Sequence, residues 1–299
     1  MTLRSGEGGV GFRPNEVGKP AQMSEAEALW YSGTWIDRIP QWLSITVFGG
    51  IFLAIWWFVA EMEWVSRILL PGPTETFSEL WDVTKNIFTG GHIFEGLWIT
   101  TQEVIWGFLA AAIAGFALGV VVGETRLGRR AVMPYLVALN ALPKVAFAPV
   151  FVAWFGFGVN SKIVMALFIA FFPVIVDTAA GLAAVDADAL MLFQSMESSR
   201  WQTLRKLKLP SALPFIFAGL KTAAVFSVVG AVVGEYLGGG KGLGELIRLS
   251  AQTLRIDRVF AMIAYLGVLG ILLFGLVAWT ERKLLFWHKS EVFEIQGTG

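Results

Sequence analysis

Charged side chains interrupt several long apolar runs of this sequence, and these are the residues that could do chemistry. They are Glu103, Lys144, Asp177, Lys221 and Glu235. An ionised side chain at mid-bilayer costs about 2.5–3.5 kcal/mol on insertion scales, so each such group needs a partner or a water-filled surface. We therefore expect solute contacts or buried ion pairs at these positions.

Other chemistries are excluded by residue type. The chain has no cysteine, and its two histidines, His92 and His288, lie outside the apolar runs. Thiolate and imidazole groups are thus missing where an intramembrane active site or metal site would need them, so we predict no catalytic residue, no metal site and no cofactor in this chain. Nucleic-acid binding is not expected either, because acidic and basic residues balance.

The glycine-rich stretch "GGGKG", Gly238–Gly242, is not a nucleotide-binding loop. The first glycine of the phosphate-loop motif would fall on Glu235, and Gly242 stands where Ser or Thr must bind magnesium. We expect a flexible glycine turn instead.

The elements that position these residues are predicted to be membrane helices. Of 299 residues, 56% are hydrophobic and 15% charged, which is typical of a protein that lies mostly in lipid. About 20 apolar residues cross the hydrocarbon core. Six runs qualify and predict an all-α integral membrane protein: 42–61, 98–123, 132–154, 161–183, 213–236 and 259–281.

Lys and Arg are more frequent in one set of connecting segments, and this bias predicts the orientation. It places both termini and residues 184–212 in the cytosol. Residues 1–40 lack the features of a signal peptide and are predicted to form a cytosolic extension with an interfacial aromatic segment. Residues 41–285 form the transmembrane domain, and 286–299 form a cytosolic tail.

The cytosolic segment "AVDADALMLFQSMESSRWQTLRKLKLPSA", 184–212, is longer than a simple connection requires. Its apolar spacing predicts two short helices, the second capped by Ser198 and Ser199 and ended by Pro210. Two interpretations remain open. The segment is either a basic helix on the membrane surface or a docking element whose exposed apolar side chains enter a groove of a partner.

This segment resembles the cytoplasmic coupling loop of permease subunits of bacterial ATP-binding-cassette importers. In that loop an "EAA" triplet is followed by a glycine and then by Leu-Pro. Counting back from Leu209-Pro210, the triplet falls on Met191–Phe193 and the glycine on Glu197, so "SSRWQTLRKLKLPSALP" matches and the first half departs. Glu197 must adopt the backbone geometry of a glycine or change it.

Four further stretches, in order, resemble the nitrate, taurine, sulfonate and bicarbonate branch of these permeases. The resemblance covers about residues 42–285. The stretches are "LLPGPTETFSELW" (69–81), "ALPKVAFAPVFVAWFGFG" (141–158), "FFPVIVDTAAGL" (171–182) and "GEYLGGGKGLGELI" (234–247).

The resemblance implies a type I importer permease fold in the bacterial inner membrane, with no ATPase site of its own. It implies a homodimer that forms the pathway, two ATPase subunits that bind ATP and magnesium on the cytosolic side, and an extracytoplasmic solute-binding protein. It also implies which residues form the ATPase-coupling loop: Glu197, Ser198, Arg200, Trp201, Leu204, Leu207 and Pro210.

Lys144 marks the candidate translocation pathway. It lies one turn from Asn140 and between Pro143 and Pro149, whose missing amide protons leave carbonyl groups that a cavity or a neighbouring helix must satisfy. At a low-dielectric site Lys144 would favour an anionic solute. The alternative is that it binds carbonyl groups at a dimer seam.

The remaining charged residues have two interpretations each. Asp177 and Lys221 lie at similar depth on antiparallel spans and are predicted to form a buried pair, unless Lys221 reaches the headgroups alone. Glu103 and Glu235 lie toward the outer ends of their spans. They are candidate pathway residues that bind solute or close the outer mouth, and a structural hydrogen-bonding role is the alternative.

The predicted function is therefore the membrane-spanning subunit of an ATP-driven importer for a small anionic or aromatic solute. The alternative is a self-sufficient secondary transporter or channel, for which the intramembrane charges are too few and scattered to form an ion relay. The sequence leaves the solute open among nitrate, sulfonates, bicarbonate, aromatic carboxylates and neutral vitamin-like rings.

Overall fold

A computed structural model describes residues 40–285, and every regular element in that range is a helix. The elements are α2 (Gln41–Glu61), α3 (Pro73–Phe88), α4 (His92–Glu124), η2 (Gly128–Val132), α5 (Met133–Ala141), η3 (Lys144–Phe147), α6 (Ala148–Phe155), α7 (Val159–Ala183), α8 (Ala187–Ser195), α9 (Arg200–Thr203), η4 (Leu204–Lys208), α10 (Leu209–Gly238), α11 (Leu243–Gln252) and α12 (Ile256–Leu284). The predictions for 1–39 and 286–299 lie outside the described residues.

The chain divides into two units, Met1–Phe58 and Val59–Gly299. Most of α2 belongs to the first unit. This helix of 21 residues is apolar on all sides, and Trp42, Phe48 and Phe52 are exposed. A helix of this length and composition is suited to cross a membrane, which confirms the span predicted at 42–61.

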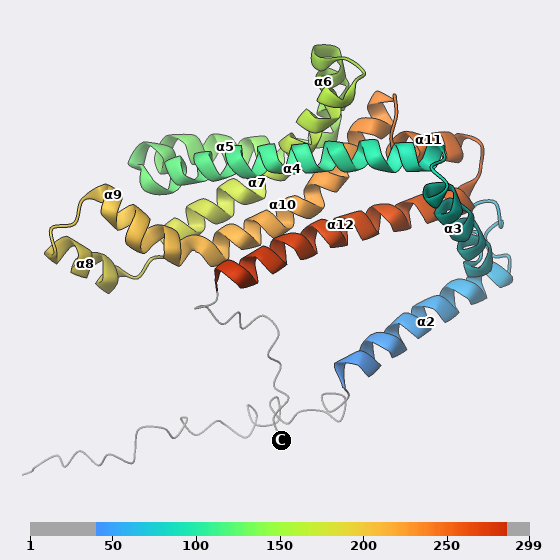
Figure 1. The fold of residues 1–299 in the computed structure, drawn as a ribbon, viewed down its shortest axis with the longest axis horizontal. Helices are drawn as coiled ribbons and strands as arrows, with labels where there is room; N and C mark the ends of the chain where they lie inside the picture. The colour runs from blue at the N-terminus through green and yellow to red at the C-terminus, as the bar shows by residue number, and fades with distance from the viewer. Residues whose placement is uncertain (1–39, 286–299) are drawn as a thin grey trace, which may run out of the picture. The chain divides into compact units, whose positions relative to one another are not determined.

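Four long helices form the body of the second unit (Figure 1). α7 packs against both α4 and α10, and α10 also packs against α12. All four are long and apolar enough to cross a membrane. The spans predicted at 98–123, 161–183, 213–236 and 259–281 are therefore confirmed, although each helix extends beyond its predicted limits.

The third predicted span, 132–154, is a bent pair of short helices. The segments Arg130–Ala141 and Lys144–Phe155 meet at 87°. The bend lies at Leu142 and Pro143, because the residue before a proline is pushed from helical into extended geometry, as the ψ of 146° at Leu142 shows. The described chain thus has five helices that could span a membrane, or six if the bent pair is one broken span.

Glycines allow α4 to approach α7 closely. Gly107, Gly115, Gly119 and Gly123 recur along one face of α4 and lie against α7. A Cβ atom added at Gly119 would lie 2.6 Å from the Cβ of Thr178, which is far inside normal contact distance. This is the packing of small residues that membrane helices use in place of the hydrophobic effect.

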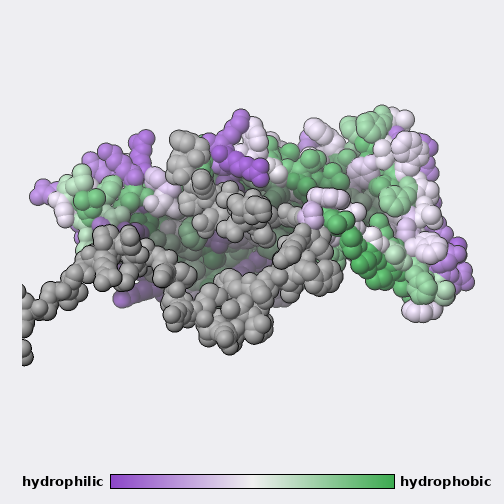
Figure 2. All heavy atoms as spheres, turned by 90° about the horizontal axis from the view of Figure 1, so that it is seen from below, coloured by the Kyte–Doolittle hydropathy of each residue, from purple (hydrophilic) through white to green (hydrophobic). Residues whose placement is uncertain are grey.

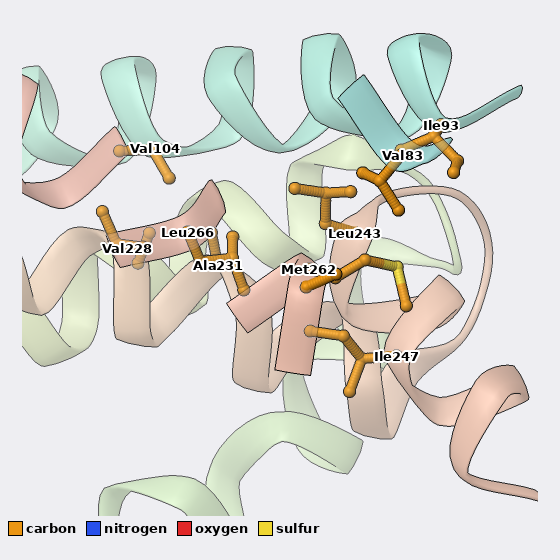
Figure 3. Close-up of a cluster of buried hydrophobic side chains, with 11 residues drawn as sticks. Val83, Ile93, Val104, Val228, Ala231, Leu243, Ile247, Met262 and Leu266 are labelled. Atoms are coloured by element: carbon orange, nitrogen blue, oxygen red, sulfur yellow. The ribbon is translucent and has the colours of Figure 1, made fainter. Parts of the chain in front are cut away.

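Short helices cover the two ends of this bundle (Figure 1). The α11 end carries α3 and α11, and the α8 end carries α8 and α9. At the α11 end a buried apolar cluster joins α3, α4, α7, α10, α11 and α12 (Figure 3). Its side chains are Val83, Ile93, Val104, Ala166, Val228, Ala231, Leu243, Ile247, Ala261, Met262 and Leu266.

The second helix of the predicted cytosolic segment does not end at Pro210, as the sequence had suggested. It continues from α9 through the wide turn η4 into α10, so that one helical stretch runs from Arg200 to Gly238. In η4 the amide of Leu209 donates to Leu204 O, five residues back. Pro210 has no amide proton to continue the hydrogen-bond ladder, and the wider turn before it lets the chain stay helical through this position.

Apolar side chains reach the surface over much of the face in Figure 2 that grey atoms leave uncovered. Many large hydrophobic residues of the long helices are exposed, among them Trp106, Ile113, Ile271 and Leu272. A soluble protein rarely exposes so much apolar surface. This surface is instead suited to contact lipid or other membrane chains.

The close packing of α4 on α7 predicts that Gly119→Ala lowers stability. The added methyl group must displace Thr178, and overpacking of this kind costs about 1–3 kcal/mol. Gly267→Ala on α12 is the matched control, because no atom lies within 4 Å of the added methyl group. Thermal unfolding in mild detergent measures both variants. Equal stability of Gly119→Ala and Gly267→Ala would contradict the packing.

Candidate functional site

A rigid turn joins α8 to α9. The amide of Ser198 donates to Phe193 O at 3.1 Å and the amide of Glu197 donates to Gln194 O at 3.0 Å, which is the Schellman pattern of a helix end. Glu197 has φ 55°, in the left-handed region that favours glycine. Of the two alternatives at this position, Glu197 adopts the glycine geometry and retains its side chain.

The start of α9 is capped as the sequence predicts. The Ser199 hydroxyl accepts from the Gln202 amide at 3.2 Å, and the Gln202 side chain accepts from the Ser199 amide at 2.9 Å. This reciprocal capping box satisfies two amide groups that a helix start leaves free. Ser198 lies just before it and donates through Oγ to Phe193 O at 2.5 Å. Both ends of the turn are therefore fixed.

Apolar side chains are exposed on α8, on this turn and on α9. Met191, Leu192, Met196 and Trp201 are each more than half exposed, and Trp201 reaches 65%. We call these four residues the α8 surface. Met191 and Leu192 fall on the "EAA" positions of the resemblance, and the sequence did not single out Met191 or Met196 as coupling residues.

The predicted coupling residues divide into two groups. Glu197, Arg200 and Trp201 are exposed. By contrast, Leu204 packs against the buried cluster of Leu182, Ala212 and Ile216. The others, Ser198, Leu207 and Pro210, are half-buried. Only part of the predicted loop is thus free to contact another protein.

An ion pair holds the start of α10 to the end of α4. The Lys208 Nζ lies 2.9 Å from Glu124 Oε1 and 3.0 Å from Oε2, and both side chains are mostly buried. Lys208 lies in the predicted cytosolic segment, and Glu124 was not predicted as its partner. No local pattern could have found it, because the two residues are 84 positions apart.

Lys144 lies at the bend between α5 and α6. Its Nζ donates to Asn140 Oδ1 at 2.7 Å and lies 4.4 Å from the centre of the Phe172 ring. Both contacts stabilise an ammonium group away from bulk water. The structure thus brings together Asn140 and Lys144, the two residues of the predicted pathway segment, and leaves Lys144 half-buried.

Glu103 and Glu235 lie together inside the α11 end. Both are completely or almost completely buried, at 1% and 0% exposed. The Thr100 hydroxyl donates to Glu235 Oε1 at 2.6 Å, and the Gly244 amide donates to Glu235 Oε2 at 2.5 Å. These hydrogen bonds fit the structural alternative for Glu235. Contact of either carboxyl group with a solute stays a prediction.

Lys162 completes this buried cluster, although the sequence did not predict it as a site residue. Its side chain is 1% exposed, and its Nζ donates to the carbonyl groups of Phe157 and Gly158, the latter at 3.1 Å. Lys162 is the fourth residue of α7, and a lysine so close to the start of a membrane helix is usually exposed to water, so burial was not expected. The signal that was available is its position one turn after "GFG", where free carbonyl groups are expected.

The predicted pair of Asp177 and Lys221 is corrected. Lys221 Nζ lies 2.8 Å from Glu281 Oε2, and in the described chain no ion pair joins Lys221 to Asp177. The reason is that α12 runs beside α10 and places Glu281 opposite Lys221. Asp177 lies on the α7 side of α10, where its Oδ2 would be 3.2 Å from a Cβ atom at Gly219.

Comparison with known proteins identifies the family. Residues 100–286 match the family described as binding-protein-dependent transport system inner membrane component. The chain belongs to this family. It is therefore a permease of the binding-protein-dependent type. The alternative of a secondary transporter or channel is not supported.

Curated relatives of the permease belong to the branch that the sequence resembles. The formylaminopyrimidine transport permease protein ThiX of Halalkalibacterium halodurans is 34% identical, over 86% of this chain and 100% of its own length. The putative aliphatic sulfonates transport permease protein SsuC of Bacillus subtilis is 32% identical, over 83% and 89%. The taurine transport system permease protein TauC of Escherichia coli is 29% identical, over 80% and 87%.

The fold of the permease matches a solved transporter. The inward-facing MetNI methionine transporter includes a chain that superimposes with a TM-score of 0.52 at 19% identity, over 64% of this permease and 94% of that chain. This similarity confirms the type I importer permease fold.

The Lys221–Glu281 contact predicts coupling between these two residues. Lys221→Met and Glu281→Gln should each lower the unfolding temperature, because each leaves a mostly buried charge without a partner. The double variant Lys221→Glu/Glu281→Lys should recover most of the loss. A double-mutant cycle should give a coupling energy of about 1–3 kcal/mol. Asp177→Asn is the control, and coupling of Lys221 to Asp177 instead of Glu281 would overturn the assignment.

Proposed function

We propose that two copies of this permease form the translocation pathway of an ATP-driven importer in a bacterial inner membrane. A separate ATPase subunit docks on the α8 surface, and an extracytoplasmic binding protein delivers the solute at the α11 end. The chain itself has no ATPase site and holds no cofactor. The observation that carries the proposal is the exposure of four large apolar side chains on and beside a turn whose backbone is fixed at both ends.

The α8 surface fits a protein partner better than a lipid surface. The turn between α8 and α9 lies within this surface. It is closed on the α8 side by the Schellman pattern and on the α9 side by the capping box, so little conformational entropy is lost on binding. Aromatic, Met and Arg side chains are enriched in protein interfaces, and Met196, Trp201 and Arg200 are exposed here together. The second interpretation, a helix lying on the membrane, would not require this fixed geometry.

Basic residues at the α8 end indicate the orientation of the permease in the membrane. Arg126, Arg200, Arg205 and Lys206 are exposed at or next to the α8 end. Positive charge is enriched on the cytosolic side of membrane proteins. We therefore propose that the α8 surface and both termini lie in the cytosol, and that α3 and α11 lie on the opposite side.

The proposed solute is small and anionic or aromatic. The relatives carry names that refer to sulfonates, taurine, nitrate and formylaminopyrimidine. Lys144 is the group of this chain that fits an anion, because it is half-buried at the bend and its partners Asn140 and Phe172 are both neutral. An arriving anion would therefore meet a charge that no carboxylate of residues 40–285 pairs with.

The docking proposal predicts loss of the ATPase from the double variant Met196→Ala/Trp201→Ala. Truncating two exposed apolar anchors should reduce the ATPase recovered with the tagged permease at least about tenfold. The measurement is a mild-detergent pull-down from native membranes. Trp98→Ala is the matched control, because Trp98 is similarly exposed on α4, near the other end of the bundle.

Two outcomes of the pull-down would contradict the proposal. Full recovery of the ATPase with the double variant would show that the α8 surface is not the docking site. A correctly folded wild-type permease without any ATPase would return the secondary-transporter alternative.

The pathway proposal predicts that Lys144→Met weakens uptake of anions. In the reconstituted complete transporter, the KM for whichever of nitrate, taurine or an alkyl sulfonate is carried should rise about tenfold, since one charge contact contributes about 1.5 kcal/mol or more. Lys85→Met, which removes an exposed lysine on α3, is the control. Unchanged uptake kinetics in Lys144→Met would remove Lys144 from the pathway.

A further inference from the structure

Two carboxyl groups and one ammonium group are buried together where α4, α7 and α10 meet at the α11 end. Glu103 comes from α4, Lys162 from α7 and Glu235 from α10, and each is at most 1% exposed. The carboxyl groups of Glu103 and Glu235 lie within hydrogen-bonding reach of each other, and Lys162 is close enough to interact with both. Two carboxylates at such a site would repel each other without water to screen them.

The hydrogen bonds of Glu235 are those of an ionised carboxylate. Its two oxygen atoms accept from different donors, Oε1 from the Thr100 hydroxyl and Oε2 from the Gly244 amide. Donors directed at both oxygen atoms favour the charged form of a carboxyl group. Lys162 supplies the opposite charge nearby.

The surroundings of Glu103 are those of a neutral acid. Its Oε2 is buried and has no hydrogen-bond partner among the described residues. Leaving a carboxylate oxygen without a donor in the interior is far more costly than leaving the oxygen of a neutral group unpaired. In addition, two carboxyl groups can share a hydrogen bond only if one of them holds a proton.

We propose that Glu103 and Glu235 form a proton-binding site, in which Glu103 carries one proton and donates it in a hydrogen bond to the Glu235 carboxylate. With this proton, the buried cluster contains one carboxylate and one ammonium group and has no net charge. Without it, the cluster would contain two carboxylates and one ammonium group.

The bound proton stabilises the glycine hairpin between α10 and α11. Glu235 holds this hairpin through the Gly244 amide, and Thr100 accepts from the Leu243 amide at 2.8 Å. A Cβ atom on Gly244 would lie 2.8 Å from Glu235 Oε2, so the backbone approaches the carboxylate too closely for any side chain. The Leu243 side chain is buried in the cluster of Figure 3. A second negative charge beside Glu235 would push these contacts apart.

Other charged groups around the site are already paired. Glu245 on α11 interacts with Lys162, but Arg248 holds it in a bidentate ion pair. Hydrogen bonding to Glu245 raises the pKa of Arg248, so this guanidinium stays charged. Lys241 in the hairpin pairs with Glu95 at 2.6 Å, and both are exposed. Neither pair supplies a further cation to neutralise Glu103.

The first test is an infrared spectrum at neutral pH in detergent without ester groups. The wild-type permease should show the C=O stretching band of a protonated carboxyl group, which ordinary exposed Asp and Glu do not show at this pH because their pKa values are about 4. The band should be absent from Glu103→Gln and unchanged in Glu95→Gln. No band in the wild type, or a band that persists in Glu103→Gln, would overturn the proposal.

The second test measures amide hydrogen exchange of residues 239–252 in the full-length permease. In Glu103→Gln the side-chain amide replaces the acid as donor to Glu235, so protection should stay within about twofold of the wild type. In Glu103→Ala this donor is lost, and protection should fall about tenfold. Glu95→Gln, which removes an exposed pair of the same hairpin, should behave as the wild type.

The outcomes of the exchange measurement separate the roles of charge and shape. A loss of protection in Glu103→Gln as large as in Glu103→Ala would show that the hairpin needs an ionised Glu103, and would overturn the proposal. Full protection in both variants would show that the proton does not stabilise the hairpin, and would overturn the proposed link between the proton-binding site and the hairpin. Because Glu103→Gln is nearly isosteric, it is not expected to unfold the chain.

Discussion

The close packing of α4 and α10 against α7 is the constraint on which the rest of the structure depends. In lipid, apolar side chains give helices no reason to associate, so association rests on close contact and on polar pairs. The glycines of α4 and of α10 provide the contact: a Cβ atom at Gly119 or at Gly230 would collide with α7. Small changes of distance between these helices are therefore costly, and each end of the bundle depends on their alignment.

Polar contacts between α4 and α10 occur near both ends of the bundle. At the α8 end Glu124 pairs with Lys208, and at the α11 end Thr100 donates to Glu235. Each contact is partly or fully buried, so breaking either one leaves its polar groups without a partner at a site that water reaches poorly. Sliding of α10 along α4 would have to break both. The two helices are thus expected to transmit a displacement of the α8 surface as a unit.

The sequence predicted what depends on local pattern and missed what depends on depth and pairing. Apolar length located all the long helices, and the capping serines were predicted from the local pattern. Motif spacing marked Glu197 as the glycine position but left open whether it adopts the glycine geometry, which the structure shows that it does. The bend at Pro143 lies inside a run whose length and overall apolar character fit a single span. The partner of Lys221 was missed because Asp177 and Glu281 lie at similar depth, and only packing decides which of them α10 faces.

The α8 surface and the proton-binding site both hold side chains in an unfavourable environment, and the free-energy cost is offset differently at each. Met196 and Trp201 are exposed apolar groups, and the partner proposed for the α8 surface would remove the free-energy cost of their exposure by covering them. Glu103 and Glu235 are polar groups taken out of water, and their cost is removed by a proton, by Lys162 and by the amide of Gly244. The first arrangement is incomplete without another protein, whereas the second is complete within one chain. The α8 end therefore depends on another protein to cover its apolar groups, whereas the buried carboxyl pair at the α11 end depends only on its proton and on groups of its own chain.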